Sequence, residues 1–235
     1  TNSTNVDERI TDDQWMNPIT LFHYKSNRND VNNDIRFKTD YTQPIGNKSK
    51  IEAGLQVRYF TLNSLYSLDN MDLETNDWVE DPEFRNDMDF LRIINSAYAT
   101  FSSNFKGIQY QIGLRGEYTD RKLEIVNTDD LYSLNRFDYF PSVHLSKQLQ
   151  KMQQMQASYS RRINRPQPWN LNPFPIFSDS YILQGGNPEL LPEYTDSYEL
   201  NYMKRLKKGF FSVEGFYRQT NNNYDMNLNL MDDGR

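Results

Sequence analysis

Apolar and polar residues alternate one by one along much of this chain, and this period of two constrains the fold more than any other feature. The apolar positions of segment 50–60 are Ile51, Ala53, Leu55, Val57 and Tyr59, and the positions between them are Glu52, Gly54, Gln56 and Arg58. Successive side chains of a β-strand point to opposite faces, whereas a helix repeats every three to four residues. The segment is therefore predicted to be a strand with one apolar and one polar face.

The same pattern predicts about ten strands. The stronger segments are 50–60, 108–118, 194–204 and 209–219, and the weaker ones are 19–24, 34–42, 90–103, 139–147, 152–161 and 224–230. No segment has the amphipathic period and end signals of a helix. The sequence predicts an all-β fold built as an antiparallel meander.

The connections between these strands alternate in length. Short hairpin turns are expected at 44–47, 104–107, 149–151 and 206–208, and long polar segments at 62–89, 119–137 and 163–193. This order places the short turns at one end of the sheet and the long loops at the other. Transmembrane β-barrels of the bacterial outer membrane have this arrangement, so the chain is predicted to come from a large barrel of that kind.

The composition agrees with a membrane barrel. The mean hydropathy is −0.86, and no apolar stretch is long enough for a transmembrane helix. Alternating barrel strands average to polar values, so a low hydropathy does not oppose the prediction. Aromatic residues make up 14% of the chain, which argues against disorder, and the net charge of −6 argues against a nucleic-acid partner.

A barrel spanning lipid must close, because an open sheet edge leaves unpaired backbone groups. The chain begins with a polar tail and ends at 231–235 without an aromatic strand end. Residues 1–235 are therefore expected to be a partial barrel domain that lacks its closing C-terminal strands.

Several ordered motifs carry a family resemblance. They are 113–119 (GLRGEYT), 139–142 (YFPS), 158–166 (SYSRRINRP), 171–174 (LNPF), 186–194 (GNPELLPEY) and 197–200 (SYEL). In combination they resemble the barrel domain of TonB-dependent receptors, in the branch of outer membrane protein β-barrel family proteins common in Bacteroidetes. The residues that carry the match most directly are Arg161, Arg162, Arg165, Pro166, Asn187, Pro188, Glu193 and Tyr194.

The resemblance implies a 22-stranded barrel in the bacterial cell outer membrane whose lumen is plugged by a separate domain, which is absent from this sequence. It implies nutrient uptake, with outer membrane lipid as surroundings and TonB as a partner reached through the missing plug. A surface lipoprotein partner and a small-molecule or glycan cargo are further implications.

Two groups of residues are candidates for a site. Arg161, Arg162 and Arg165 lie near Glu193 and Glu199 in the expected sheet, which predicts either an Arg–Glu network in the lumen or solvated arginines. The loop aromatics Trp169, Phe174, Phe177 and Tyr181 are candidate ligand-binding residues. Their alternative role is to pack the loop against itself or the barrel rim.

Catalytic and metal-binding motifs are not found in the sequence. The chain has no cysteine, its two histidines (His23 and His144) fall in different predicted strands, and no nucleophile elbow or phosphate-binding loop is present. We expect no enzyme activity, no metal and no cofactor. The acidic segment 69–89 could offer oxygen ligands to calcium, but a solvated acidic loop explains it more simply.

Two other functions remain open at this point. A barrel wall with long loops could serve adhesion or lipoprotein binding in place of transport. A soluble β-sandwich with a binding loop would also show strands of period two.

Overall fold

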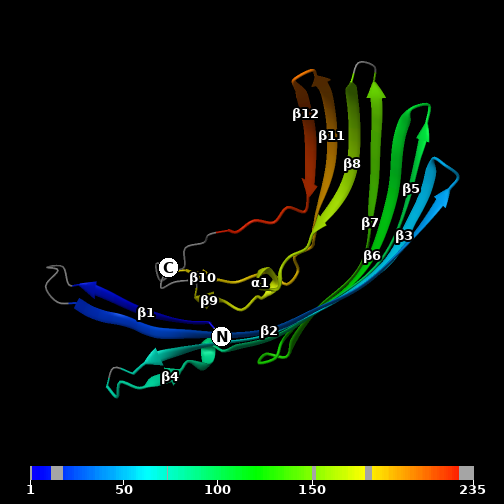
Figure 1. Cartoon of the computed structure of the whole chain (residues 1–235). Helices are drawn as coiled ribbons and strands as arrows, with labels where there is room; N and C mark the ends of the chain where they lie inside the picture. Colours follow the sequence, from blue (N-terminus) through cyan, green and yellow to red (C-terminus); the bar gives the residue numbers. More distant parts are fainter. Residues whose placement is uncertain (1, 12–17, 73, 150–151, 178–181, 228–235) are drawn as a thin grey trace.

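A single curved sheet of antiparallel strands makes up most of the molecule (Figure 1). The computed structural model describes the chain except residues 1, 12–17, 73, 150–151, 178–181 and 228–235. The strands of the sheet are β1 (Asn2–Thr11), β2 (Pro18–Ile45), β3 (Ser49–Met71), β4 (Trp78–Glu80), β5 (Asn86–Phe105), β6 (Ile108–Ile125), β7 (Asp130–Leu149), β8 (Gln153–Asn164), β11 (Glu193–Leu206) and β12 (Gly209–Asn221). Each strand pairs with the next along the chain, except that β4 adds only to the end of β3.

The meander of about ten strands predicted from the sequence is therefore confirmed. The other described sheet has two short strands, β9 (Ile176–Phe177) and β10 (Leu183–Gln184), so the described strands do not form a β-sandwich. No described residue belongs to a helix long and apolar enough to cross a membrane.

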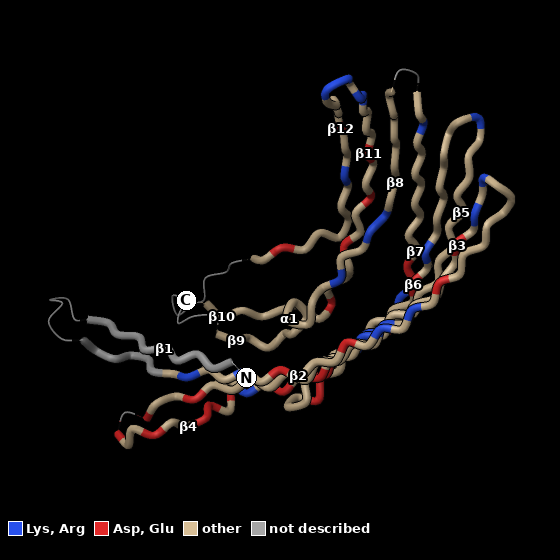
Figure 2. Tube along the Cα trace, viewed as in Figure 1, with Lys and Arg blue, Asp and Glu red and all other residues tan. Residues whose placement is uncertain are grey.

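Short turns join the strands at one end of the sheet. Gly46 and Gly107 have φ values of 61° and 79°, in the left-handed region where a residue without Cβ is least strained. Lysines gather at these turns (Lys48, Lys106, Lys207 and Lys208), whereas acidic residues gather around β4 at the opposite end (Figure 2). The two ends of the sheet thus differ in charge as well as in loop length.

The convex face of the sheet carries an apolar band next to the short turns. Leu55 and Leu114 each keep 57% of their surface exposed there, while Gln56 and Arg58 point to the concave face. The band covers about 35–45, 51–59, 93–105, 108–118, 137–145, 155–159, 198–202 and 211–217, where apolar side chains are outward on most alternate positions. Beyond it the outward positions turn polar, as at Asn63 and Asp120.

Beyond this band the alternation continues with its two faces exchanged. Leu62, Tyr66 and Leu68 of β3 are buried on the concave face, and Leu123 and Ile125 of β6 are buried in the same way. The period of two therefore persists, but the apolar residues have moved from the outer to the inner face.

This exchange overturns two predicted loops. Most of 62–89 and 119–137 is strand, since β3 runs to Met71, β5 begins at Asn86, and β6 and β7 are joined by the short turn 126–129. The short turns predicted at 44–47, 104–107 and 206–208 are found at the other end, whereas most of the turn predicted at 149–151 lies outside the described residues. Segments 62–89 and 119–137 were predicted to be loops because their apolar residues lie on the opposite alternate positions from those of the preceding strand.

The N-terminal and C-terminal segments also differ from prediction. The polar tail forms β1, and the predicted strands 19–24 and 34–42 are parts of one strand, β2. Residues 224–227 are not in a strand, and the rest of the strand predicted at 224–230 lies outside the described residues. Polar residues at the N-terminus form strand structure because backbone pairing with β2 depends little on side-chain polarity.

Candidate functional site: the inner loop and the concave face

The connection between β8 and β11 folds back over the concave face of the sheet (Figure 1). We call residues 165–192 the inner loop; it contains the single helical turn α1 (Pro168–Leu171) and the β9–β10 pair. The sequence predicted an irregular long loop at 163–193. The structure shows that this loop is the cover under which the apolar residues of β3, β5 and β6 are buried.

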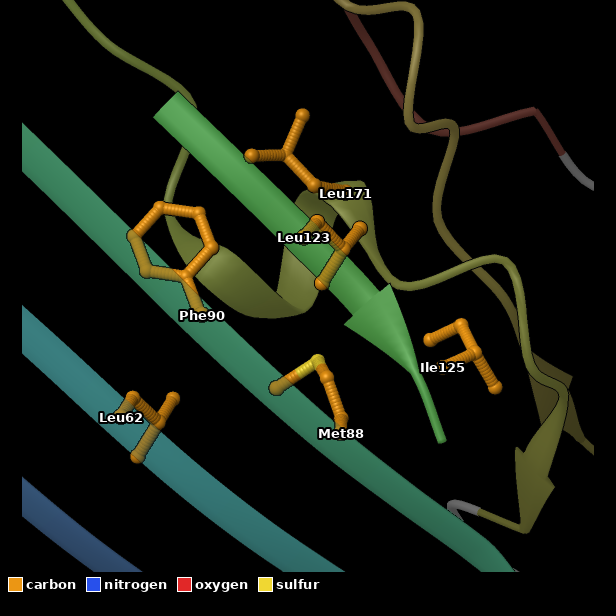
Figure 3. Close-up of a cluster of buried hydrophobic side chains, with 6 residues drawn as sticks. All are labelled: Leu62, Met88, Phe90, Leu123, Ile125 and Leu171. Atoms are coloured by element: carbon orange, nitrogen blue, oxygen red, sulfur yellow. The ribbon is translucent and has the colours of Figure 1, made fainter. Parts of the chain in front are cut away.

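Leu171 anchors the inner loop to the sheet. Its side chain is fully buried among Leu62, Met88, Phe90, Leu123 and Ile125 (Figure 3). Burying a leucine side chain contributes about 1.5–3 kcal/mol. A second apolar cluster joins Phe177 of β9 to Tyr24, Tyr66 and Leu68, and burial raises the pKa of Tyr66.

Two buried arginines hold the backbone of the inner loop. Arg121 donates from Nη2 to the Pro188 carbonyl at 2.9 Å and from Nη1 to the Leu190 carbonyl at 3.2 Å, and Arg92 donates to the Pro166 carbonyl at 3.4 Å. Burial lowers the pKa of both guanidinium groups. Arg92 and Arg121 are directly opposite each other on β5 and β6, a repulsive arrangement for like charges. The loop carbonyls offset this repulsion by turning their negative ends toward both side chains.

The Gly186-Asn187-Pro188 motif closes the inner loop on itself. The Gly186 amide donates to the Asn172 carbonyl at 2.6 Å, and the Asn187 amide donates to the Asn170 carbonyl at 2.8 Å. A Cβ at Gly186 would lie 2.4 Å from the Asn170 carbonyl oxygen. Glycine is therefore required for this close approach, and the following Pro188 places its carbonyl on Arg121.

Tyr194 fills the space where β7 and β8 part. The pairing of these strands runs from Leu149–Gln153 to Ser142–Ser160. Beyond it, the Tyr194 hydroxyl donates to Asp138 at 2.6 Å, and the Arg136 and Arg161 guanidinium groups lie 5.2 and 5.1 Å from the Tyr194 ring centroid. Burial, together with the bond to Asp138, raises the pKa of Tyr194 to about 12.

The arginines singled out in the sequence have other partners than those expected. Arg165 pairs with Glu117 at 2.5 Å and Arg161 approaches Asp196 at 4.0 Å, while Arg162 is exposed. Glu193 accepts a bond from Asn164, and Glu199 lies 3.9 Å from Arg218. The predicted Arg–Glu contacts therefore occur with another partner, since Arg165 and Arg115 both pair with Glu117 of β6. Arg161 is the register partner of Asp196. Sequence proximity to Glu193 and Glu199 did not reveal these partners.

The four loop aromatics separate into different environments. Phe177 is buried in the second apolar cluster and Phe174 packs against it, whereas Trp169 is exposed. Tyr181 lies outside the described residues. The sequence analysis did not identify Arg92 and Arg121 as site residues. The one feature that could have indicated them is a charged residue at a position of the strand that faces inward.

The concave face also contains a wide polar hollow near the short turns. Its volume is about 960 Å³, and its lining includes Gln111, His144, Gln156, Glu199, Asn201 and Glu214. Most of the residues that line this hollow are polar, in contrast to the outward residues of the convex band. In the part of the chain that the structure describes, no three acidic or histidine side chains come together as a metal site.

The acidic segment 69–89 uses several of its carboxylates locally. Asp72 accepts from the Glu74 amide at 2.9 Å, and that bond lowers its pKa. Asp81 accepts from the Glu83 amide at 3.0 Å at the start of the 3₁₀ turn η1 (Pro82–Phe84). These bonds shape the connection between β3 and β5.

Comparison with known proteins gives a family and a fold. The model of a family described as "Outer membrane protein beta-barrel family" matches residues 1–234. No curated protein matches the sequence. Among solved structures, the ferric citrate transporter FecA in its unliganded form has a TM-score of 0.59 at 14% identity, over 96% of this chain and 32% of that one. The copper transporter OprC has a TM-score of 0.62 at 12% identity, over 86% of this chain and 31% of that one. The chain spans about a third of the length of these two proteins, and at such identities the likeness concerns the fold.

Proposed function

The chain belongs to the outer membrane protein beta-barrel family, and we propose that it forms wall strands and an inner loop of a barrel that takes up a nutrient across the bacterial outer membrane. The observation that carries the proposal is the contrast between the two faces of the sheet. The convex band exposes leucine, valine and aromatic side chains, and the concave face presents the polar hollow and the inner loop. A lipid-facing exterior and a wet interior are what a transport barrel needs.

The inner loop gives the proposal a mechanism. It crosses the concave face and is held by Leu171 and by the carbonyl bonds of Arg92 and Arg121. In a closed barrel this position lies in the lumen, where the loop narrows the path of a solute. We assign the chain no catalytic step: its part is to exclude lipid, line the path and restrict it.

Energised uptake would need a plug domain and contact with TonB. The two solved structures compared above are named as transporters, one for ferric citrate and one for copper. These names support transport as a class of function, and the cargo of this chain need not be either of theirs.

Uptake by cells provides the test. A strain lacking the whole gene is compared with the same strain carrying the wild-type gene, on a panel of labelled iron chelates, vitamins and oligosaccharides, with and without an inner-membrane uncoupler. We expect loss of energy-dependent uptake of one nutrient in the deletion strain. Unchanged uptake across the panel would contradict the proposal.

The β4 region favours a second function, binding of a surface partner. Trp78 and Val79 are 40% and 55% exposed in the connection between β3 and β5, among Glu80 and neighbouring acidic residues. If removing residues 72–85 abolishes capture of a surface lipoprotein while deletion of the gene leaves uptake intact, the interaction role is the correct one.

A further inference from the structure

Among the described residues of the inner loop, Trp169 is the exposed aromatic residue, and the geometry of α1 explains its exposure. Trp169 and Leu171 are two positions apart in one helical turn, so their side chains point in nearly opposite directions. Leu171 is fully buried against the sheet, while Trp169 keeps 55% of its surface exposed. The anchor that holds the loop therefore also presents the indole ring away from the sheet core.

Two hollows of about 320 Å³ each border this indole. Both are lined by Arg28 of β2. One also contains Asp30, Asn32 and Gln167, and the other contains Asn86, Asn172 and Gln184. The exposed indole is thus flanked by amide groups that can both donate and accept hydrogen bonds. Phe60, Tyr66 and Phe174 also line the hollows and add aromatic surface beside it.

The lining is close to neutral. Arg28 pairs with Asp30 at 3.0 Å, so its charge is already balanced within the hollow. An anionic ligand would have to compete with Asp30 for this guanidinium. A ligand with hydroxyl groups could bond the amides and the outer edges of the pair without separating them.

We propose that Trp169 and these polar side chains bind a neutral oligosaccharide. One sugar ring stacks on the indole, because ring C–H groups carry slight positive charge and the π-face is negative. The flanking hydroxyls exchange hydrogen bonds with Asn32, Gln167 and Asn172. One aromatic surface with a few placed polar groups is the usual composition of a small-ligand site. The inference rests on the proposed function, since it names the class of cargo that the lumen would conduct.

The test uses the full-length protein in detergent micelles. Binding of short malto-, cello-, xylo- and manno-oligosaccharides is measured by isothermal titration calorimetry. We expect one of these series to bind and Trp169→Ala to weaken that binding at least tenfold. Asn32→Ala should weaken it several-fold. Trp78→Ala is the matched control, because Trp78 is also exposed but lies in the β4 region, and it should leave the affinity unchanged.

Two outcomes overturn the inference: none of the four series binds, or Trp169→Ala binds as tightly as the wild type. The uptake assay separates this result from the proposed function. If the deletion strain loses uptake of another nutrient while no oligosaccharide binds, the transport function stands and the sugar site is wrong. If Trp169-dependent binding occurs while uptake of every nutrient is unchanged, the site stands and the transport function is wrong.

Discussion

Single residues show which face of the sheet meets lipid. Leu114 lies near the middle of the apolar band and is exposed on the convex face, while Gln111 points to the concave hollow three positions earlier. Replacing Leu114 with lysine should lower the free energy of unfolding of the full-length protein in lipid vesicles by about 2–4 kcal/mol, because a charge at the bilayer midplane is poorly solvated. Denaturant titration measures this loss. Gln111→Lys is the control, and equal losses for both variants would mean that the faces are assigned wrongly.

The Tyr194 side chain fills the space where β7 and β8 separate, and a substitution at this position tests how much its hydroxyl group stabilises the protein. Removing its hydroxyl in Tyr194→Phe takes away a hydrogen bond from the buried Asp138 and should cost about 1–3 kcal/mol of stability at neutral pH. Tyr198→Phe, an exposed neighbour on the same strand, should cost much less.

The same substitution has a pH signature. The folded-state pKa of Tyr194 is raised from 10 to about 12, so the folded protein keeps a proton that the unfolded chain loses in this range. The stability that this group contributes is complete below pH 10 and is lost as the pH rises toward 12. Denaturation from pH 9 to 12 should therefore show a steeper loss for the wild type than for Tyr194→Phe. Parallel curves would contradict the assigned environment of Tyr194.

At the scale of an element, the inner loop depends on its anchor. Leu171→Ala empties a site in the cluster of Leu62, Met88 and Phe90 and should cost about 2–5 kcal/mol in the free energy of opening the loop. Hydrogen exchange of the backbone amides in 165–177 measures that opening. Leu191→Ala removes an exposed leucine from the same loop and should leave the exchange unchanged.

Gly186 offers a second test of the same element. Alanine there would meet the Asn170 carbonyl, so Gly186→Ala should separate the two arms of the inner loop and speed amide exchange at Asn187. Gly209, where an added Cβ meets nothing within 4 Å, is the control position. Slow exchange at Asn187 in Gly186→Ala would show that the close approach is not needed.

At the scale of the whole molecule, the orientation of the protein in the outer membrane can be measured by protease cleavage on intact cells. In outer-membrane barrels the long loops face outward and the short turns face the periplasm. Trypsin added to cells that express the full-length protein should therefore cleave after the exposed Arg85, in the connection between β3 and β5. Cleavage after Lys48 and Lys207, at the short turns, should require permeabilised outer membranes. The reverse order would place the protein the other way round.

Much of the fold could be predicted from the sequence, because alternation and turn residues act locally. Leu55 and Gln56 lie on opposite faces of β3, as the alternation predicts, and the turn at Gly46 lies where it is predicted. The halves of the strands beyond the apolar band, away from the short turns, could not be predicted. Leu62 and Tyr66 in this part of β3 face a loop more than a hundred residues away in the chain. The contacts of Arg92 and Arg121 with the inner loop depend on the same distant packing. The sequence therefore did not point to these two arginines, although it did point to loop residues such as Trp169, Phe177 and Pro188.

The exchange of faces along β3, β5 and β6 has a consequence for how the barrel is assembled. A strand that paired one residue out of step would turn Leu55 into the lumen and, in the same movement, expel Leu62 and Leu68 into water. The shifted register would be unfavourable in both halves of the strand, because each half would place its apolar side chains on the wrong face. The same one-residue shift back would restore both halves. The register of each of these strands with the preceding strand is thus specified by two separate sets of apolar side chains, before the next strand of the sheet pairs with it.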